Sequence, residues 1–300
     1  MNKFIIVTDS CSDLDRELRE TYNIEYMQMH YSYDDKDFPA NLDWDEKAFR
    51  EFYGLMRDGV RIKTTQVVSD DYEKAFESYL RQGYGVLSIS CSSALSGSYR
   101  GSLVAKDNLK KKYPDAEIVC VDSRNACLGL GLICITAAKL RAEGKTLAET
   151  AAYIEAHKQE VNQFGAVDNL VYLKRAGRVS ATSAVFGGLL QVKPIIISDV
   201  NGQNVAVEKV KGRRNSMARI AELFCQTYRP HPYQQVFVVH GDCMEDAEEL
   251  KRLVGEGLAD KNVDVRICGI GPIIGATTGP GMLGVYGYGK EVTYDGEKQK

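Results

Sequence analysis

Residues 87–99, LSISCSSALSGSY, have the clearest chemical capacity in this sequence, because four serines and a glycine lie within positions 92–98. They follow an apolar segment of strand character, and Gly97 opens a segment that we expect to be a helix. A strand that ends where a helix begins leaves free N–H groups at the positive end of the helix dipole. The pattern predicts an anion pocket, to which hydroxyls also contribute, at Ser92, Ser93, Ser96 and Ser98. Ser and Gly are equally typical of turns and caps, so this loop alone leaves both interpretations open.

A second polar loop, Lys63-Thr64-Thr65-Gln66, precedes another predicted helix. The segments up to about residue 158 alternate strand, loop and helix, which favours a parallel sheet covered by helices. Ligands of such sheets bind at the carboxyl ends of the strands. We therefore expect the two hydroxyl loops to converge there.

The alternation changes after about Val161, and a sheet of mixed direction is expected for the second half. An Asn201-Gly202 pair predicts a hairpin in this half. We predict two α/β domains, residues 1–160 and 161–300, with a ligand cleft between them. The N-terminal domain should hold a parallel sheet with helices on both faces, and the C-terminal domain a mixed sheet with helices.

Several local patterns predict particular element boundaries. A helix is expected to begin at Ser12, Asp43 and Glu46 should cap the next helix, and Ser69 should cap a third. Alternating side chains over residues 27–33 predict one continuous strand. A helix of small residues is expected from Ser180, and Thr146 with Glu149 predicts a capping box.

The composition is that of an ordinary globular protein. The net charge of -3 and pI of about 5.9 argue against nucleic acid as a bulk electrostatic partner. Eight cysteines without a C-x-x-C pair, several inside apolar runs, indicate reduced core thiols. No signal peptide or apolar run of membrane-spanning length is evident, so we expect a cytoplasmic protein.

Residues for acid, base or nucleophilic catalysis are not grouped in the sequence. It contains no G-x-S-x-G motif and no metal-ligand spacing, so neither a catalytic serine nor a metal site is predicted. The four histidines are scattered, and only His240, at the end of an apolar strand, is placed like a site residue. A structural role is the favoured interpretation of His240.

Taken in order, the loops resemble those of the DegV family of bacterial fatty-acid-binding proteins. The similarity spans nearly the whole chain and rests on the stretches TDSCSDL (8–14), KTTQ (63–66), SSALSGSY (92–99), VDSRNACLGLG (121–131), YLKRAGR (172–178), LLQVKPII (189–196), VVHGD (238–242) and IGPIIGATTGPG (270–281).

The resemblance implies a long-chain fatty acid held between two domains, without a cofactor. It assigns the grip on the carboxylate to Thr64 and Ser96, and we expect auxiliary donors at Thr65, Ser93 and the Gly97 N–H. This agrees with the chemistry of the loops, because a carboxylate needs a few fixed donors while the rest of a pocket can be apolar. Each buried methylene contributes roughly 0.8 kcal/mol.

The resemblance also implies presentation of the acid to a separate, dihydroxyacetone-kinase-like fatty acid kinase, which makes acyl phosphate for phospholipid synthesis. Arg175 and Arg178 match the family's head-group arginine stretch, although Ala176 replaces the usual glycine. Thr277, beside Thr278, stands where the family has a histidine, and it has no cationic form.

Two hypotheses follow. The first is a non-catalytic carrier of long-chain fatty acid. The second is a kinase-coupled component, or an enzyme acting on a phosphorylated or carboxylated metabolite in the same cleft. It rests on Arg175, Arg178 and the glycine-rich segment 269–289.

Overall fold

The computed structural model describes residues 3–181 and 192–296, and its first sheet is parallel throughout. Within those ranges the sheet has four strands in the order β2-β1-β6-β7. Their bounds are β1 Phe4–Asp9, β2 Ile24–Met27, β6 Gly85–Ser90 and β7 Ile118–Asp122. β1 and β6 pair in parallel from Phe4 opposite Gly85, so the loops that follow both strands leave the same edge of the sheet.

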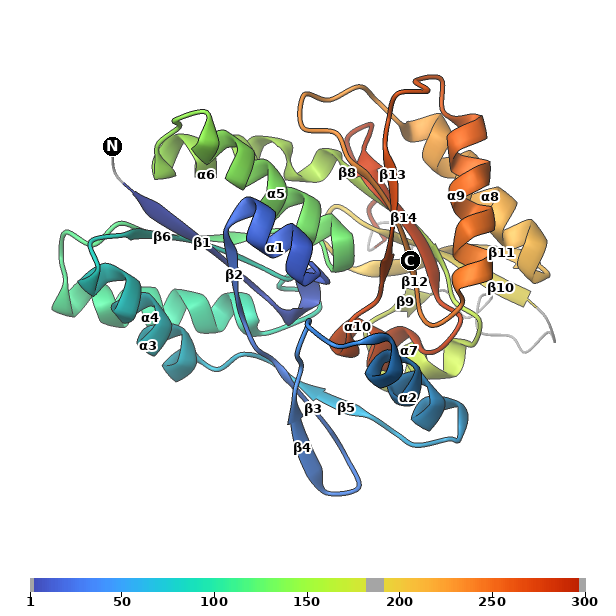
Figure 1. Ribbon diagram of the computed structural model, residues 1–300, viewed down its shortest axis with the longest axis horizontal. Helices are drawn as coiled ribbons and strands as arrows, with labels where there is room; N and C mark the ends of the chain where they lie inside the picture. The colour runs from blue at the N-terminus through green and yellow to red at the C-terminus, as the bar shows by residue number, and fades with distance from the viewer. Residues whose placement is uncertain (1–2, 182–191, 297–300) are drawn as a thin grey trace.

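Helices cover both faces of this sheet, as expected. α3 and α4 lie on one face, and α1, α5 and α6 lie on the other (Figure 1). Their bounds are α1 Arg16–Tyr22, α3 Ser69–Arg81, α4 Ser98–Lys112, α5 Cys127–Ala142 and α6 Leu147–His157. Among the described residues, no helix is both long and apolar enough to cross a membrane.

A second sheet is mixed and lies in the other half of the chain. Among the described residues it has seven strands in the order β13-β12-β14-β8-β10-β11-β9. The strands are β8 Val161–Ala166, β9 Ser180–Ala181, β10 Val192–Ser198, β11 Asn204–Lys211, β12 Val236–His240, β13 Val265–Gly269 and β14 Leu283–Tyr288. α8 (Arg213–Thr227) and α9 (Met244–Gly257) cover one face, and α5 contacts β8 and β14 (Figure 1). The α/β fold class with these two kinds of sheet is confirmed, whereas the domain boundary at 160/161 stays a prediction.

A small antiparallel sheet projects beside the first one, and it corrects two expectations. It consists of β3 (His30–Tyr33), β4 (Lys36–Pro39) and β5 (Lys63–Thr65) in the described ranges. The expected single strand over 27–33 is two strands, because the Ser10 hydroxyl accepts the Met29 N–H at 3.0 Å between them. The expected Thr loop is strand β5, in which Thr64 pairs with Tyr31.

Several predicted helix starts are displaced by a few residues. Asp13 adopts a left-handed conformation (φ 49°) after the 3₁₀ turn η1 (Ser10–Ser12), so α1 begins at Arg16 rather than at Ser12. The Asp15 carboxylate caps α1 by accepting the Leu18 N–H at 2.9 Å.

α2 (Glu46–Arg57) and α3 show similar displacements. Asp45 caps α2, since Asp43 pairs with Arg19 instead. Val68 rather than Ser69 is the N-cap residue of α3.

The predictions for later segments have mixed outcomes. The capping box of Thr146 and Glu149 is confirmed, and Gly202 turns the hairpin between β10 and β11 with φ 74°. The helix expected at Ser180 is wrong at its start, which is strand β9, and its remainder to residue 191 lies outside the described residues. The last elements are α7 (Leu170–Ala176), α10 (Pro272–Thr278) and the 3₁₀ turn η2 (Lys158–Glu160).

Candidate functional site

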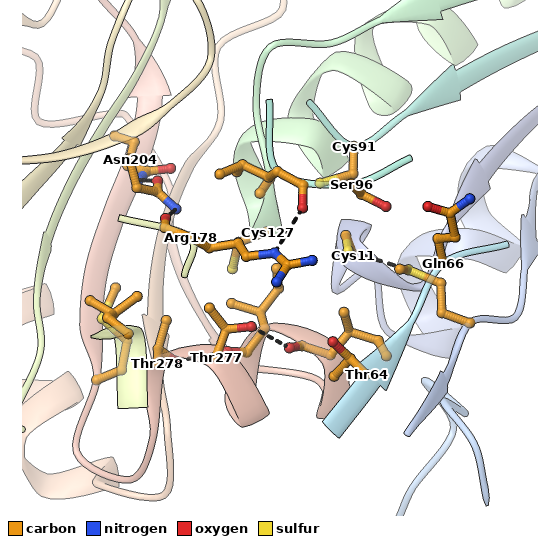
Figure 2. A pocket seen from close by; sticks show the side chains of 18 of the residues that line it. Cys11, Thr64, Gln66, Cys91, Ser96, Cys127, Arg178, Asn204, Thr277 and Thr278 are labelled. Carbon is orange, nitrogen blue, oxygen red and sulfur yellow. Dashed lines mark hydrogen bonds between the residues drawn. The ribbon is translucent and has the colours of Figure 1, made fainter. Parts of the chain in front are cut away.

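A cavity of about 340 Å³ lies between the two large sheets, and both halves of the chain line it. We call it the main cavity. Figure 2 shows its labelled side chains converging from β5, the loop after β6, α10 and the segment after α7. The lining residues are Cys11, Met29, Thr64, Thr65, Gln66, Cys91, Leu95, Ser96, Gly97, Ala126, Cys127, Gln163, Leu173, Arg178, Ile196, Asn204, Ile273, Ile274, Thr277, Thr278, Met282 and Tyr286.

Thr64 and Ser96 both line this cavity, although 31 residues separate them in the chain. The buried Ser98 hydroxyl accepts the Val67 N–H at 3.2 Å, and this bond holds the end of the β5 segment against the start of α4. The Ser96 hydroxyl lies 3.0 Å from that of Ser98 and accepts the Ser98 N–H at 3.2 Å. The two hydroxyl segments therefore meet, as the sequence predicted.

The helix α4 adds a favourable electrostatic field at Ser96. Gly97 is its N-cap residue, the first turn holds no acidic residue, and the last turn holds three lysines. The positive end of a helix dipole stabilises an anion next to it. The Gln66 side chain packs directly against Gly97, so a larger residue at position 97 would make the Gln66 amide move.

Arg178 supplies the single cation among the described residues that line the main cavity, and none of these residues is Asp or Glu. Its Nε donates to the Leu95 carbonyl oxygen at 3.2 Å, which holds the guanidinium at the rim of the serine loop (Figure 2). A fixed guanidinium is suited to bind a carboxylate. The cavity thus has a positive polar end, and no acidic residue is among the described residues that line it.

Sulfur and hydrocarbon groups form much of the remaining wall. Cys11, Cys91 and Cys127 are buried there, and burial raises the pKa of the Cys127 thiol. Cys11 Sγ contacts Met29 Sδ at 3.4 Å. Neutral thiols behave as small apolar groups, so this wall offers an acyl chain a hydrophobic environment.

Two buried carboxyl groups lie next to this wall. Burial raises the pKa of Asp9 to about 6 and that of Asp13 to about 7. The hydrogen bonds that each carboxyl group accepts lower its pKa, but by less than burial raises it. The Asp9 carboxylate accepts the N–H groups of Cys11 and Cys91, both at 2.9 Å. The raised pKa values weaken the negative charge that a bound anion would meet.

Two predicted site residues, Ser93 and Arg175, are not among the described residues that line the main cavity. Ser93 directs its hydroxyl and its N–H to the Asp122 carboxylate, a group that the sequence analysis did not place beside this loop. Arg175 lines an adjacent cavity of about 300 Å³, which we call the basic cavity.

The basic cavity shares part of its wall with the main cavity. The shared residues are Thr64, Arg178 and Thr277. Arg61 and Lys63 also line the basic cavity, no acidic residue lines it within the described ranges, and its four cations form no ion pair there. The basic cavity is therefore suited to a more highly charged anion than a carboxylate.

The hydroxyls of Thr277 and Thr278 already have partners within α10. They donate to the carbonyl oxygens of Ile273 at 3.2 Å and Ile274 at 2.9 Å. Both residues still line the main cavity, with Thr277 on the side of Thr64 (Figure 2).

Three amide side chains in the cavity wall were not predicted as site residues. The side-chain amide of Gln66 lies against Gly97. The side-chain N–H of Gln163 on β8 donates to the side-chain oxygen of Asn204 on β11 at 2.9 Å. Asn204 in turn donates to the Arg178 carbonyl oxygen at 3.3 Å. Gln66 already stood in a motif, whereas Gln163, buried within β8, and the half-buried Asn204, at the start of β11, belong to no motif that the sequence analysis used.

The scattered histidines do include one group that the fold assembles. His157, Glu160 and His231 place potential metal-ligand atoms within 4.8 Å of one another, outside the main cavity. His157 Nδ1 lies 2.9 Å from Glu160, and His231 Nδ1 accepts the Tyr233 N–H at 3.2 Å. His231 Nε2 lies 3.2 Å from the Tyr153 hydroxyl. These contacts use three of the four ring nitrogens, and the group joins the end of α6 to the loop before β12.

The fold and the cavity define a class: an α/β protein with a parallel and a mixed sheet and an amphipathic cavity between its halves. A family model described as "Uncharacterised protein, DegV family" matches residues 3–290. The chain is 39% identical over 287 residues to a DegV domain-containing protein of Clostridium perfringens, covering 95% of this chain and 97% of that protein. This protein belongs to the DegV family.

Two solved structures have the same fold. DegV from Bacillus subtilis, described as a fatty acid binding protein, is 25% identical with a TM-score of 0.82, covering 97% of this chain and 100% of that chain. A stearic acid-binding protein from Eubacterium ventriosum is 24% identical with a TM-score of 0.84, covering 96% of this chain and 99% of that chain.

Proposed function

We propose that this protein binds one long-chain fatty acid in the main cavity, without catalysing a reaction on its own. The observation that carries the proposal is the cavity itself, which has Thr64, Ser96 and Arg178 at one end and thiol and hydrocarbon walls elsewhere. Family membership and the fatty acid binding described for the Bacillus subtilis relative support the same ligand class.

The head group is the part of the ligand that the polar end of the main cavity recognises. In our proposal the hydroxyls of Thr64 and Ser96 donate to the carboxylate, with the Gly97 N–H and Thr65 as further donors and Arg178 neutralising its charge. The acyl chain lies against residues such as Met29, Leu173 and Ile196. Burial at roughly 0.8 kcal/mol per methylene makes a long chain the main source of affinity.

Titration of delipidated protein with a matched ligand series tests this proposal. Calorimetry with palmitate, the corresponding fatty alcohol and octanoate should give tight, stoichiometric binding for palmitate alone. The alcohol lacks the charge and octanoate lacks eight methylenes, so each should bind at least tenfold more weakly. Equal affinity for palmitate and the alcohol would refute the head-group assignment.

We further propose that the bound acid is presented to a separate fatty acid kinase. The basic cavity supports this role, because Arg61, Lys63 and Arg175 surround a space that adjoins Thr64 and Arg178. A carboxylate oxygen would attack the γ-phosphorus of the kinase's ATP, forming an O–P bond while ADP leaves. The cations would stabilise the charge of the transferred phosphoryl group.

An assay with purified components distinguishes two roles of this protein, that of a passive carrier and that of a subunit that presents the fatty acid to a kinase. The protein, a dihydroxyacetone-kinase-like fatty acid kinase, ATP and palmitate are mixed, and acyl phosphate is trapped as the hydroxamate. Product formation that requires all four components supports presentation. Its absence with a kinase that is active on another DegV protein would leave a passive carrier and would implicate Thr277, which replaces the family histidine.

A further inference from the structure

Two cysteines in the wall of the main cavity lie at the ends of neighbouring strands. Cys11 follows β1 within the turn η1, and Cys91 is the first residue after β6. β1 and β6 are adjacent and parallel, so both cysteines leave the sheet at the same edge. Both thiols are free, and both line the main cavity (Figure 2). We call Cys11 and Cys91 the thiol pair.

One carboxylate holds the backbone of both cysteines. Asp9 Oδ1 accepts the Cys11 N–H and Asp9 Oδ2 accepts the Cys91 N–H, each at 2.9 Å. Neighbouring strands of a sheet lie about 4.8 Å apart, and a disulfide requires a Cα separation of about 4.4–6.8 Å. The backbone positions of the thiol pair are therefore suited to a disulfide.

The two thiols also contact each other. A hydrogen bond with the Cys91 thiol raises the pKa of Cys11 well above its ordinary value. The same contact lowers the pKa of Cys91, but burial and nearby carboxylates leave that pKa raised overall. Cys91 is therefore the more readily ionised thiol of the pair, and the Cys11 sulfur lies next to it.

The main cavity is the route by which a small reagent reaches the thiol pair. Cys11 is 3% exposed and Cys91 is 1% exposed, and both line this space of about 340 Å³. Such a space admits molecules of the size of water or hydrogen peroxide. An acyl chain in the cavity would cover the same wall, so occupancy of the cavity controls access to the two sulfur atoms.

We propose that the thiol pair is an oxidation site, in which a peroxide joins Cys11 and Cys91 in a disulfide when the main cavity is empty. A bound fatty acid protects the pair. The protection rests on the proposed function, whereas formation of the disulfide does not. Disulfides of reducing compartments are mostly transient, and this one is reversed by a thiol reductant.

Hydrogen peroxide is the two-electron oxidant of this reaction. The Cys91 thiol loses its proton and attacks one peroxide oxygen, the O–O bond breaks, and the departing hydroxide takes up that proton. The Cys11 sulfur then attacks the sulfur of the Cys91 sulfenic acid and the S–O bond breaks. The hydroxide that leaves takes up the Cys11 proton. Two thiols and one hydrogen peroxide thus give one disulfide and two waters.

Peptide mapping of oxidised protein tests the disulfide. Delipidated full-length protein is treated with hydrogen peroxide at about pH 8.5, where more thiolate is present, and its remaining thiols are alkylated before digestion. We expect the loss of two hydrogen atoms from the intact mass and a cross-linked Cys11–Cys91 peptide, both reversed by dithiothreitol. The proposal is overturned if the two cysteines stay reduced, gain only oxygen atoms, or pair with other cysteines.

Cys127 provides a matched control, because it is a buried thiol of the same cavity with different neighbours. Its thiol bonds the side chains of Asp13 and Tyr286 rather than another thiol. Cys127→Ser should form the disulfide at the wild-type rate, whereas Cys91→Ser should form none. If Cys91→Ser does not fold, Cys11→Ser takes its place, and the wild-type peptide map decides without either variant. A mass loss of two hydrogen atoms that persists in a folded Cys91→Ser protein contradicts the assignment.

Palmitate tests the protection, because a saturated acid does not itself consume peroxide. Protein loaded with palmitate should form the disulfide roughly tenfold more slowly than delipidated protein. Native mass spectrometry of the same sample reports whether palmitate is bound. Bound palmitate with an unchanged rate refutes protection, whereas a protein that takes up no palmitate and still forms the disulfide refutes only the proposed fatty acid function.

Discussion

The Nε atom of Arg178 donates a hydrogen bond to the carbonyl oxygen of Leu95 at 3.2 Å. This single bond joins the segment after α7 to the serine loop after β6, and it spans the polar end of the main cavity. Because Arg178 also lines the basic cavity, its guanidinium stands between the proposed fatty acid site and the surface where a kinase would act.

Removal of the two cavity hydroxyls should weaken fatty acid binding strongly. A hydrogen bond to a charged group contributes about 1.5–3 kcal/mol, so Thr64→Ala with Ser96→Ala should lower palmitate affinity roughly 100-fold or more. Calorimetry measures the change. Ser93→Ala is the matched control, since Ser93 bonds Asp122 and should leave affinity unchanged. An unaltered affinity in the double variant would contradict the assignment.

The two predicted arginines should separate binding from presentation. Arg178→Gln should lower palmitate affinity about tenfold, because its guanidinium lines the main cavity. Arg175→Gln should leave palmitate affinity unchanged and reduce acyl phosphate formation with a kinase, because Arg175 lines only the basic cavity. Equal effects of both variants on binding would argue against two distinct roles.

A bulky residue in the hydrocarbon wall should select against long chains. Ile196 is 3% exposed and lines the main cavity, so Ile196→Trp should occupy space that an acyl chain needs. Palmitate affinity should fall at least tenfold, while octanoate affinity should change little. Competition with a fluorescent fatty acid measures both. A parallel loss for both acids would instead indicate a general disturbance of the cavity.

Buried Asp13 should give stability a distinctive pH dependence. Its folded pKa of about 7 exceeds the ordinary 3.8, so between these values the folded state binds more protons than the unfolded state. Its contribution to stability is therefore greatest at low pH and is lost as pH rises toward about 7, with a slope of at most about 1.4 kcal/mol per unit. The pKa of Asp9 is raised to about 6, so its contribution to stability is likewise lost as the pH rises.

Urea unfolding at about pH 5 and about pH 8 measures that dependence. Asp13→Asn should reduce the stability lost between the two pH values, because the amide does not titrate. The exposed Asp34→Asn variant should match the wild type. An unchanged or enlarged pH dependence in Asp13→Asn would contradict the raised pKa of Asp13.

Many strands and helix caps, and part of the candidate site, could be predicted from local sequence patterns. Residues 236–239 form a continuous apolar run, and the capping box at Thr146 is a local pattern, so both elements were predictable from sequence. The meeting of Thr64 with Ser96 agrees with the motifs, but the strand-end rule holds for Ser96 alone, because Thr64 lies on β5 of the small antiparallel sheet. Ser98, the residue that joins their segments by accepting the Val67 N–H, was counted only as a ligand donor.

Features that depend on long-range pairing were not predictable in the same way. Thr64 lies on a strand because β3 pairs with it, and Ser93 turns from the cavity because Asp122 of β7 lies beside it. Asp13 reads as a helix residue locally, yet its contact with the Gly271 N–H joins positions 258 residues apart.

Native mass spectrometry of the protein as purified tests the central claim most directly. We predict a mass excess of one long-chain fatty acid per chain, which organic extraction removes and added palmitate restores. Protein that carries no acyl ligand and takes up none after extraction would contradict a fatty-acid-binding function for the main cavity.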